Sequence, residues 1–142
     1  MGNREWGKRP HERLEVWRDA MGLVEAVHRI PSRCPDSELT SQERRAAVSV
    51  PSNIAEGAAR TWRAECVRDL SIARGSLSDL DTQRQHVQRP AFVEIDQDVD
   101  ALIDRLFARL TAQMKALVKL VSVAGTPPDS PFPFSDSLEH AR

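Results

Sequence analysis

Residues 39–57, with the sequence LTSQERRAAVSVPSNIAEG, decide the fold because their apolar side chains recur at helical spacing. Ala47, Val50, Ile54 and Ala58 follow one another at intervals of three or four residues, which places them on one face of an α-helix. Pro51 lies inside this stripe and removes a backbone donor, so it should bend the helix. The stripe keeps its phase across Pro51, and we therefore expect one bent helix, not two.

The start of this helix is predicted at Thr40-Ser41-Gln42-Glu43. A threonine followed three residues later by a glutamate forms a capping box, in which the Thr40 hydroxyl accepts from the Glu43 amide and the Glu43 carboxylate reaches back. We therefore expect the helix to begin at Thr40.

Similar stripes on both sides of this segment predict three more helices, at 14–30, at 61–88 and from about 96 to 124. Proline residues end the first helix and separate the third from the fourth, Thr61 is a candidate N-cap, and Gly125 is a candidate C-cap. The predicted inward residues are Trp17, Ala20, Met21, Val24 and Val27, then Cys66, Leu70, Ala73, Leu77, Leu80 and Val87, then Val99, Ile103, Leu106, Leu110, Leu117 and Val121.

Gly75 lies in the middle of the third predicted helix. A glycine at such a position costs about 1 kcal/mol relative to alanine. We expect a close approach between helices to compensate for that cost.

Four helices joined by short connections predict an all-α fold, an antiparallel up-down-up-down four-helix bundle with its second helix kinked at Pro51. Residues 1–13 are expected to form a flexible N-terminal segment, residues 14–125 the bundle, and residues 126–142 a disordered tail rich in proline and serine. For the tail, the alternative is that Phe132 and Phe134 dock on a neighbouring surface.

The composition is typical of a single domain with no export or membrane signal. The chain has 142 residues and a net charge of −1, and its two cysteines, Cys34 and Cys66, lie far apart in the sequence. The polar N-terminus and the absence of any run near the ~18 apolar residues of a membrane span favour a cytoplasmic protein with reduced thiols.

A line of polar residues runs along the second predicted helix. Arg45, Ser49, Asn53 and Glu56 share one face because they are spaced at helical intervals. This face is a solvated surface, an internal hydrogen-bond network that also serves the bend, or a binding surface for a partner protein or a phosphate.

The predicted turn at residues 57–60 also sets a register between the second and third helices. Antiparallel pairing through this turn places Arg74 beside Arg44 or Arg45, and Ser49 near Asp69. Arg74 is therefore included with the polar line as part of a candidate network.

Residues 39–57, followed by LSIARGSL at 70–77, resemble the bacterial four helix bundle protein family. Its members are also described as proteins encoded in intervening sequences of large-subunit ribosomal RNA genes. The resemblance extends from about residue 14 to residue 120, and its pattern is L-T-S-Q-x-R-R-A-A-x-S-x-P-S-N-I-A-E-G, then I-A-R-G-S-L. It implies a four-helix bundle that assembles as a homopentamer and has no established enzymatic activity.

A related branch of that family comprises the accessory proteins of diversity-generating retroelements. That branch is strongly basic and binds a reverse transcriptase and nucleic acid. The near-neutral charge of this chain departs from it.

The sequence lacks a recognisable constellation for catalysis. None of the histidines has the setting of a catalytic triad, and no glycine-rich phosphate loop occurs. One E-x-x-H match, Glu25 to His28, has no second copy to complete a di-metal site. We therefore predict no enzymatic activity, no cofactor and no metal.

These observations favour a non-enzymatic, homo-oligomeric scaffold or adaptor whose assembly creates a surface for an unidentified protein partner. The alternative is a nucleic-acid-binding accessory protein, in which arginines repeated by symmetry contact phosphates. The arginines of this band are Arg44, Arg45, Arg60, Arg63, Arg68 and Arg74.

Overall fold

The computed structural model describes residues 9–31, 37–87 and 89–124, with side chains as far as residue 120, and most of these residues are helical. There it contains four α-helices, two short 3-10 helices and no strand, so the all-α prediction is confirmed for these residues. The elements are η1 (Pro10–Arg13), α1 (Glu15–His28), α2 (Ser37–Ala58), α3 (Arg63–Gln85), η2 (Pro90–Phe92) and α4 (Val93–Ala124). The predicted cap at Gly125, the tail and residues 1–8 lie outside the described residues.

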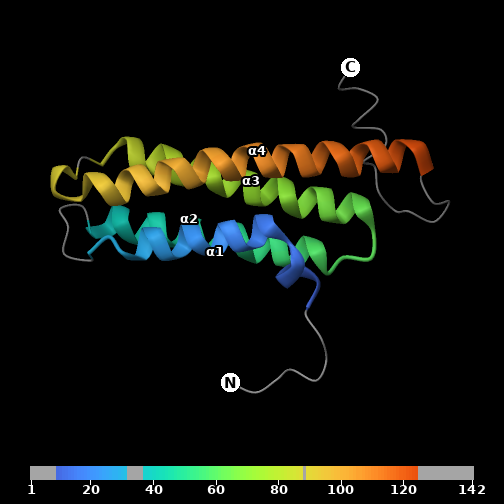
Figure 1. Cartoon of the computed structure of the whole chain (residues 1–142), viewed down its shortest axis with the longest axis horizontal. Helices are drawn as coiled ribbons and strands as arrows, with labels where there is room; N and C mark the ends of the chain where they lie inside the picture. The colour runs from blue at the N-terminus through green and yellow to red at the C-terminus, as the bar shows by residue number, and fades with distance from the viewer. Residues whose placement is uncertain (1–8, 32–36, 88, 125–142) are drawn as a thin grey trace.

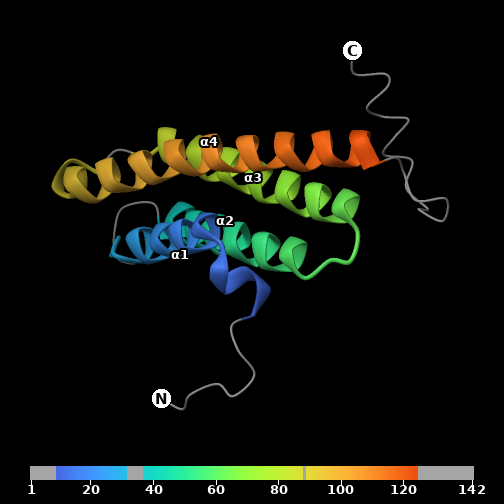
Figure 2. The same ribbon diagram turned by 45° about the vertical axis from the view of Figure 1, so that its right-hand side comes forward.

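The four α-helices lie side by side around one core (Figures 1 and 2). α1 and α3 each pack against both α2 and α4, and η1 packs against α1 and α2. Buried residues from every α-helix meet in this core, among them Leu23, Val27, Val50, Ile54, Leu70, Leu77, Leu106 and Leu110.

The inward face of α1 differs from the predicted one. Val16 and Leu23 are buried, whereas Met21 is 38% exposed, so the prediction of Met21 as a core residue is wrong. Trp17 packs against the edge of the core, and its ring centroid lies 4.8 Å from that of His11. Two overlapping stripes share Ala20 and Val27, and spacing alone did not distinguish them.

Three predicted helix starts are also corrected. α2 begins at Ser37, so Thr40 and Glu43 lie within the helix, both fully or almost fully buried, and the predicted capping box is wrong. α3 begins at Arg63 with Trp62 at the N-cap position, one residue after Thr61. α4 begins at Val93, directly after η2, because the helical winding already starts at Pro90.

α2 continues through Pro51 as a single helix, as predicted from its unbroken stripe. The side chains that follow the proline donate to nearby backbone carbonyls. Ser52 Oγ lies 2.8 Å from the Val48 oxygen, and Asn53 Nδ2 lies 2.8 Å from the Ser49 oxygen. Such bonds from short polar side chains support the backbone around a helical proline.

α4 is the longest helix, and Figures 1 and 2 show it extending beyond the ends of α1 and α2. Leu117 is only partly buried, and the side chain of Val121 lies outside the described residues. Among the described segments, no helix combines the length and apolar character needed to cross a membrane.

Candidate functional site

The centre of the polar line on α2 is a small network between α2 and α3. Ser49 Oγ lies 2.8 Å from Ser76 Oγ, and Asn53 Nδ2 donates to Ser49 Oγ at 3.1 Å. These side chains are half-buried in the seam between the helices. Arg45, one turn earlier, is exposed, and no hydrogen bond or ion pair joins it to the described part of the chain.

Glu56, at the end of the polar line, belongs to a separate ionic group. Arg60 Nη2 lies 2.7 Å from Glu56 Oε1, and Arg60 Nε lies 2.8 Å from Asp69 Oδ2. Asp69 is buried, and its hydrogen bond and negative charge raise the pKa of Arg60 above its ordinary value. Gly57 permits this close packing, since a Cβ on it would lie 3.2 Å from the Asp69 Cβ.

The predicted register between α2 and α3 is wrong by about two helical turns. Ser49 meets Ser76 where Asp69 was expected, and Arg74 Nη1 contacts Thr111 of α4 at 3.4 Å, not Arg44 or Arg45. The reason is the connection, because residues 59–62 continue without helical structure and α3 begins only at Arg63. The five predicted network residues therefore do not form one network.

The arginines of the predicted band have different surroundings. The Arg44 guanidinium donates to the carbonyl of Ile30 and is half-buried, and Arg60 is held by two carboxylates. Arg63 and Arg68 are exposed on α3, and neither forms an ion pair within residues 9–31, 37–87 and 89–124. Only part of the band is thus available to a ligand.

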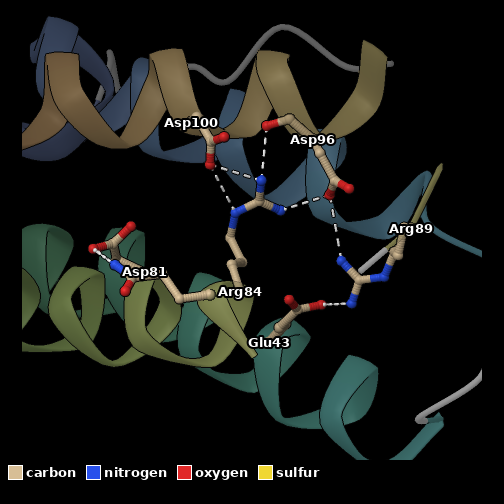
Figure 3. Close-up of polar contacts among 7 residues, drawn as sticks. Glu43, Asp81, Arg84, Arg89, Asp96 and Asp100 are labelled. Atoms are coloured by element: carbon tan, nitrogen blue, oxygen red, sulfur yellow. Dashed lines mark hydrogen bonds and ion pairs between the residues drawn. The ribbon is translucent and has the colours of Figure 1, made fainter. Parts of the chain in front are cut away.

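A partly buried ionic cluster that the sequence did not reveal joins α2, α3 and α4 at one end of the molecule (Figure 3). Arg89, in the connection before η2, lies 2.5 Å from Glu43 of α2 and 3.3 Å from Asp96 of α4. Arg84, near the end of α3, lies 3.0 Å from Asp96 and 2.7 Å from Asp100.

The cluster comprises Glu43, Arg84, Arg89, Asp96 and Asp100. Glu43 and Arg89 are almost completely shielded from solvent. Arg84 lies in phase with Leu77 and Leu80 on the core stripe of α3, and this position was a readable signal of a buried charge. The cluster has a structural role, not a ligand-binding one, because both of its arginines are already paired with carboxylates of the same chain.

The outer surface of α2 and α3 has a different character. Val48 and Ile72 are 44% and 46% exposed and lie within about one turn of the Ser49–Ser76 contact. Gly75, next to Ser76, is exposed, and a Cβ built on it would meet no atom within 4 Å. We call the surface formed by Val48, Ser49, Ile72, Gly75 and Ser76 the α2–α3 face.

The predicted compensation for Gly75 is therefore not found among the residues that the structure describes. No neighbouring helix in the described part approaches Gly75 closely enough to need the missing side chain. The close approach at a glycine occurs instead at Gly57, between α2 and α3.

A hollow between α3 and α4 offers a second surface. Its volume is about 360 Å³, and it is lined by Arg74, Thr111, Met114, Lys115, Val118 and Lys119. Within the described ranges, no cluster of three or more histidine, cysteine or acidic side chains is arranged to hold a metal ion.

Comparison with known families identifies the chain. No curated protein matches it. A family described as "23S rRNA-intervening sequence protein" matches residues 12–114, which include α1, α2, α3 and most of α4. The match confirms the resemblance carried by residues 39–57 and 70–77, and the chain belongs to the family of 23S rRNA-intervening sequence proteins.

Proposed function

We propose that this protein is a non-enzymatic, cytoplasmic scaffold or adaptor that assembles with copies of itself, as a pentamer in view of its family resemblance. The assembly presents a repeated surface to a protein partner. A closed ring requires a heterologous contact, in which one face of each copy meets a different face of the next.

The observation that carries this proposal is that Gly75 is exposed on the α2–α3 face beside the exposed apolar side chains of Val48 and Ile72. Gly75 costs α3 about 1 kcal/mol relative to alanine, and within residues 9–31, 37–87 and 89–124 no neighbouring helix makes a close contact that would offset that cost. A helix of a second copy that packs over Gly75 would gain the close backbone approach that only glycine permits. Val48 and Ile72 beside it supply apolar surface for such a contact.

The test compares two glycine substitutions by light scattering across a range of protein concentrations. Gly75→Ala places a methyl group in the proposed contact. Overpacking of about 1–3 kcal/mol should raise the dissociation constant roughly 5-fold to 150-fold. Gly22→Ala is the matched control, because Gly22 also lies inside a helix and a Cβ there would meet nothing within 4 Å.

Both substitutions should stabilise the isolated helix by about 0.5–1 kcal/mol, but only Gly75→Ala should weaken assembly. A wild-type protein that is monomeric at micromolar concentration contradicts the proposal. So does a Gly75→Ala variant that assembles as the wild type does.

We also infer that the helices form an antiparallel up-down-up-down bundle with α2 bent at Pro51. At one end of the molecule, Arg29 after α1 lies 3.6 Å from Asp98 near the start of α4, and Arg84 near the end of α3 contacts Asp96. The end of one helix thus meets the start of its neighbour. Residual dipolar couplings from amides on both sides of Pro51 would contradict the bend if they fitted a single straight axis.

A second candidate function, nucleic-acid binding, is favoured by Arg45, Arg63 and Arg68, which are exposed and free of ion pairs in the described part of the chain. Repeated by symmetry, these cations would contact phosphates without reading sequence. Mobility shifts with RNA and DNA at low salt test it, and binding should weaken steeply as salt rises. No shift at low salt excludes this function.

A further inference from the structure

The apolar stripe of α4 continues beyond the core. Val99, Ile103, Leu106 and Leu110 are buried, but Leu120 is 48% exposed. Met114 and Leu117, the next positions of the stripe, pack against the edge of the core and are only partly buried. The stripe is therefore longer than the surface that covers it.

The change in burial coincides with the end of α1. Glu15, the first residue of α1, lies 3.4 Å from Arg109, so α1 covers α4 only up to about this level. Figures 1 and 2 show the later part of α4 projecting past both α1 and α2, with α3 beside it. The projecting part thus has an apolar side with room for another segment.

The hollow between α3 and α4 lies on this projecting part. Met114 and Val118 give it an apolar lining, and Arg74, Lys115 and Lys119 surround them with positive charge. None of these three cations forms an ion pair with a carboxylate in the described part of the chain. A matching ligand is an extended peptide that carries both apolar and acidic side chains.

We propose that the occupant is the segment of the same chain that follows α4, residues 126–142. This segment contains Phe132 and Phe134, with Asp129 and Asp136 on either side of them. The phenylalanines fit the apolar lining, and the aspartates fit the surrounding lysines and arginine. This segment would then cover the apolar side of the projecting part of α4.

The length of the chain permits this contact. Met114 lies ten residues before Ala124, which corresponds to about 15 Å along the helix. Phe132 lies eight residues after Ala124, and an extended chain of that length spans up to ~26 Å. Pro127, Pro128 and Pro131 restrict the free segment, so ordering it costs less entropy.

Methionine methyl groups provide a direct probe, because the full chain contains only three methionines, Met1, Met21 and Met114. In full-length protein labelled with ¹³C at these methyl groups, Phe132→Ala/Phe134→Ala should move the Met114 signal by more than its line width, since aromatic rings leave its surroundings. The Met21 signal should stay in place, because Met21 lies on α1. An unmoved Met114 signal overturns the proposal.

A matched control in the same segment is Ser135→Ala/Ser137→Ala, which should leave the Met114 signal unchanged. Rising salt should move the wild-type Met114 signal toward its position in the phenylalanine variant, because the aspartate and lysine charges become screened. A Met114 shift that the serine variant reproduces contradicts recognition by the phenylalanines.

The same experiment distinguishes a tail from a second copy. In a mixture of labelled Phe132→Ala/Phe134→Ala protein and excess unlabelled wild type, the labelled Met114 signal should remain at the variant position. Its return to the wild-type position would show that another copy supplies the tail and would overturn binding within one chain. The inference does not rest on the assembly proposed above, because it concerns a different surface.

Discussion

Loss of Arg89 should destabilise the protein more than loss of any exposed arginine. Glu43 is fully buried, and its Oε2 accepts a hydrogen bond from Arg89, whereas Oε1 has no hydrogen-bond partner in the described part of the chain. Arg89→Met therefore leaves a buried carboxylate without a donor. Asp96 keeps its bond from Arg84, so the main effect falls on Glu43.

Breaking a buried ion pair from one side costs about 3–5 kcal/mol. That is a large share of the 5–15 kcal/mol that stabilises a typical domain. At about 3 °C per kcal/mol, the melting temperature should fall by roughly 10–15 °C. The double substitution Glu43→Met/Arg89→Met removes both charges and fills the space with apolar atoms. It should recover most of the loss.

Urea unfolding followed by circular dichroism measures these free energies, at one fixed protein concentration because assembly adds to the apparent stability. Arg29→Met is the matched control. Arg29 and Asp98 are both more than half exposed, and a pair of this kind contributes about 0–1 kcal/mol. The reasoning is refuted if Arg89→Met costs no more than Arg29→Met, or if the double variant is less stable than Arg89→Met.

Two further predictions concern the packing of α2 against α3. Gly57→Ala should lower the urea midpoint, because its methyl group would lie 3.2 Å from the Asp69 Cβ and 3.3 Å from the Cys66 carbonyl oxygen. Overpacking of about 1–3 kcal/mol then exceeds the gain of about 1 kcal/mol in helix propensity, and a raised midpoint would contradict this. For Cys66, burial and the Asp69 charge raise the pKa of the thiol, so a Cys34→Ser chain should react slowly with Ellman's reagent. The rate should keep increasing above the ordinary cysteine pKa of about 8.5, and a plateau there would count against the prediction.

The number and approximate place of the helices could be predicted because each helix carries an apolar stripe that the core requires. The residues at which the helices begin were harder to predict. Thr40 and Glu43 satisfy the spacing of a capping box, yet α2 begins at Ser37, and both side chains face inward. A local pattern of four residues does not reveal whether another turn of helix precedes it.

The relation between α2 and α3 could not be predicted for a different reason. Their register depends on the conformation of residues 59–62, and every residue added to that connection moves the pairing of all later positions. Ser49 consequently meets Ser76, not Asp69. The Glu43–Arg89 contact could not be predicted from the sequence either. Arg89 lies outside the helical stripes, and the connection between α3 and α4 brings it to α2.

The two proposed contacts use different surfaces, and this makes them separable. The α2–α3 face contains Ile72 and Gly75 of α3. The hollow between α3 and α4 is lined by Arg74, which lies between these two residues in the sequence of α3. Residues one apart on a helix point about 100° away from each other, so a partner over Gly75 need not cover Arg74. Gly75→Ala should therefore change the size of the particle without moving the Met114 signal. The phenylalanine variant should move the Met114 signal without changing the size. A variant that changed both would mean that the tail and a second copy compete for one surface.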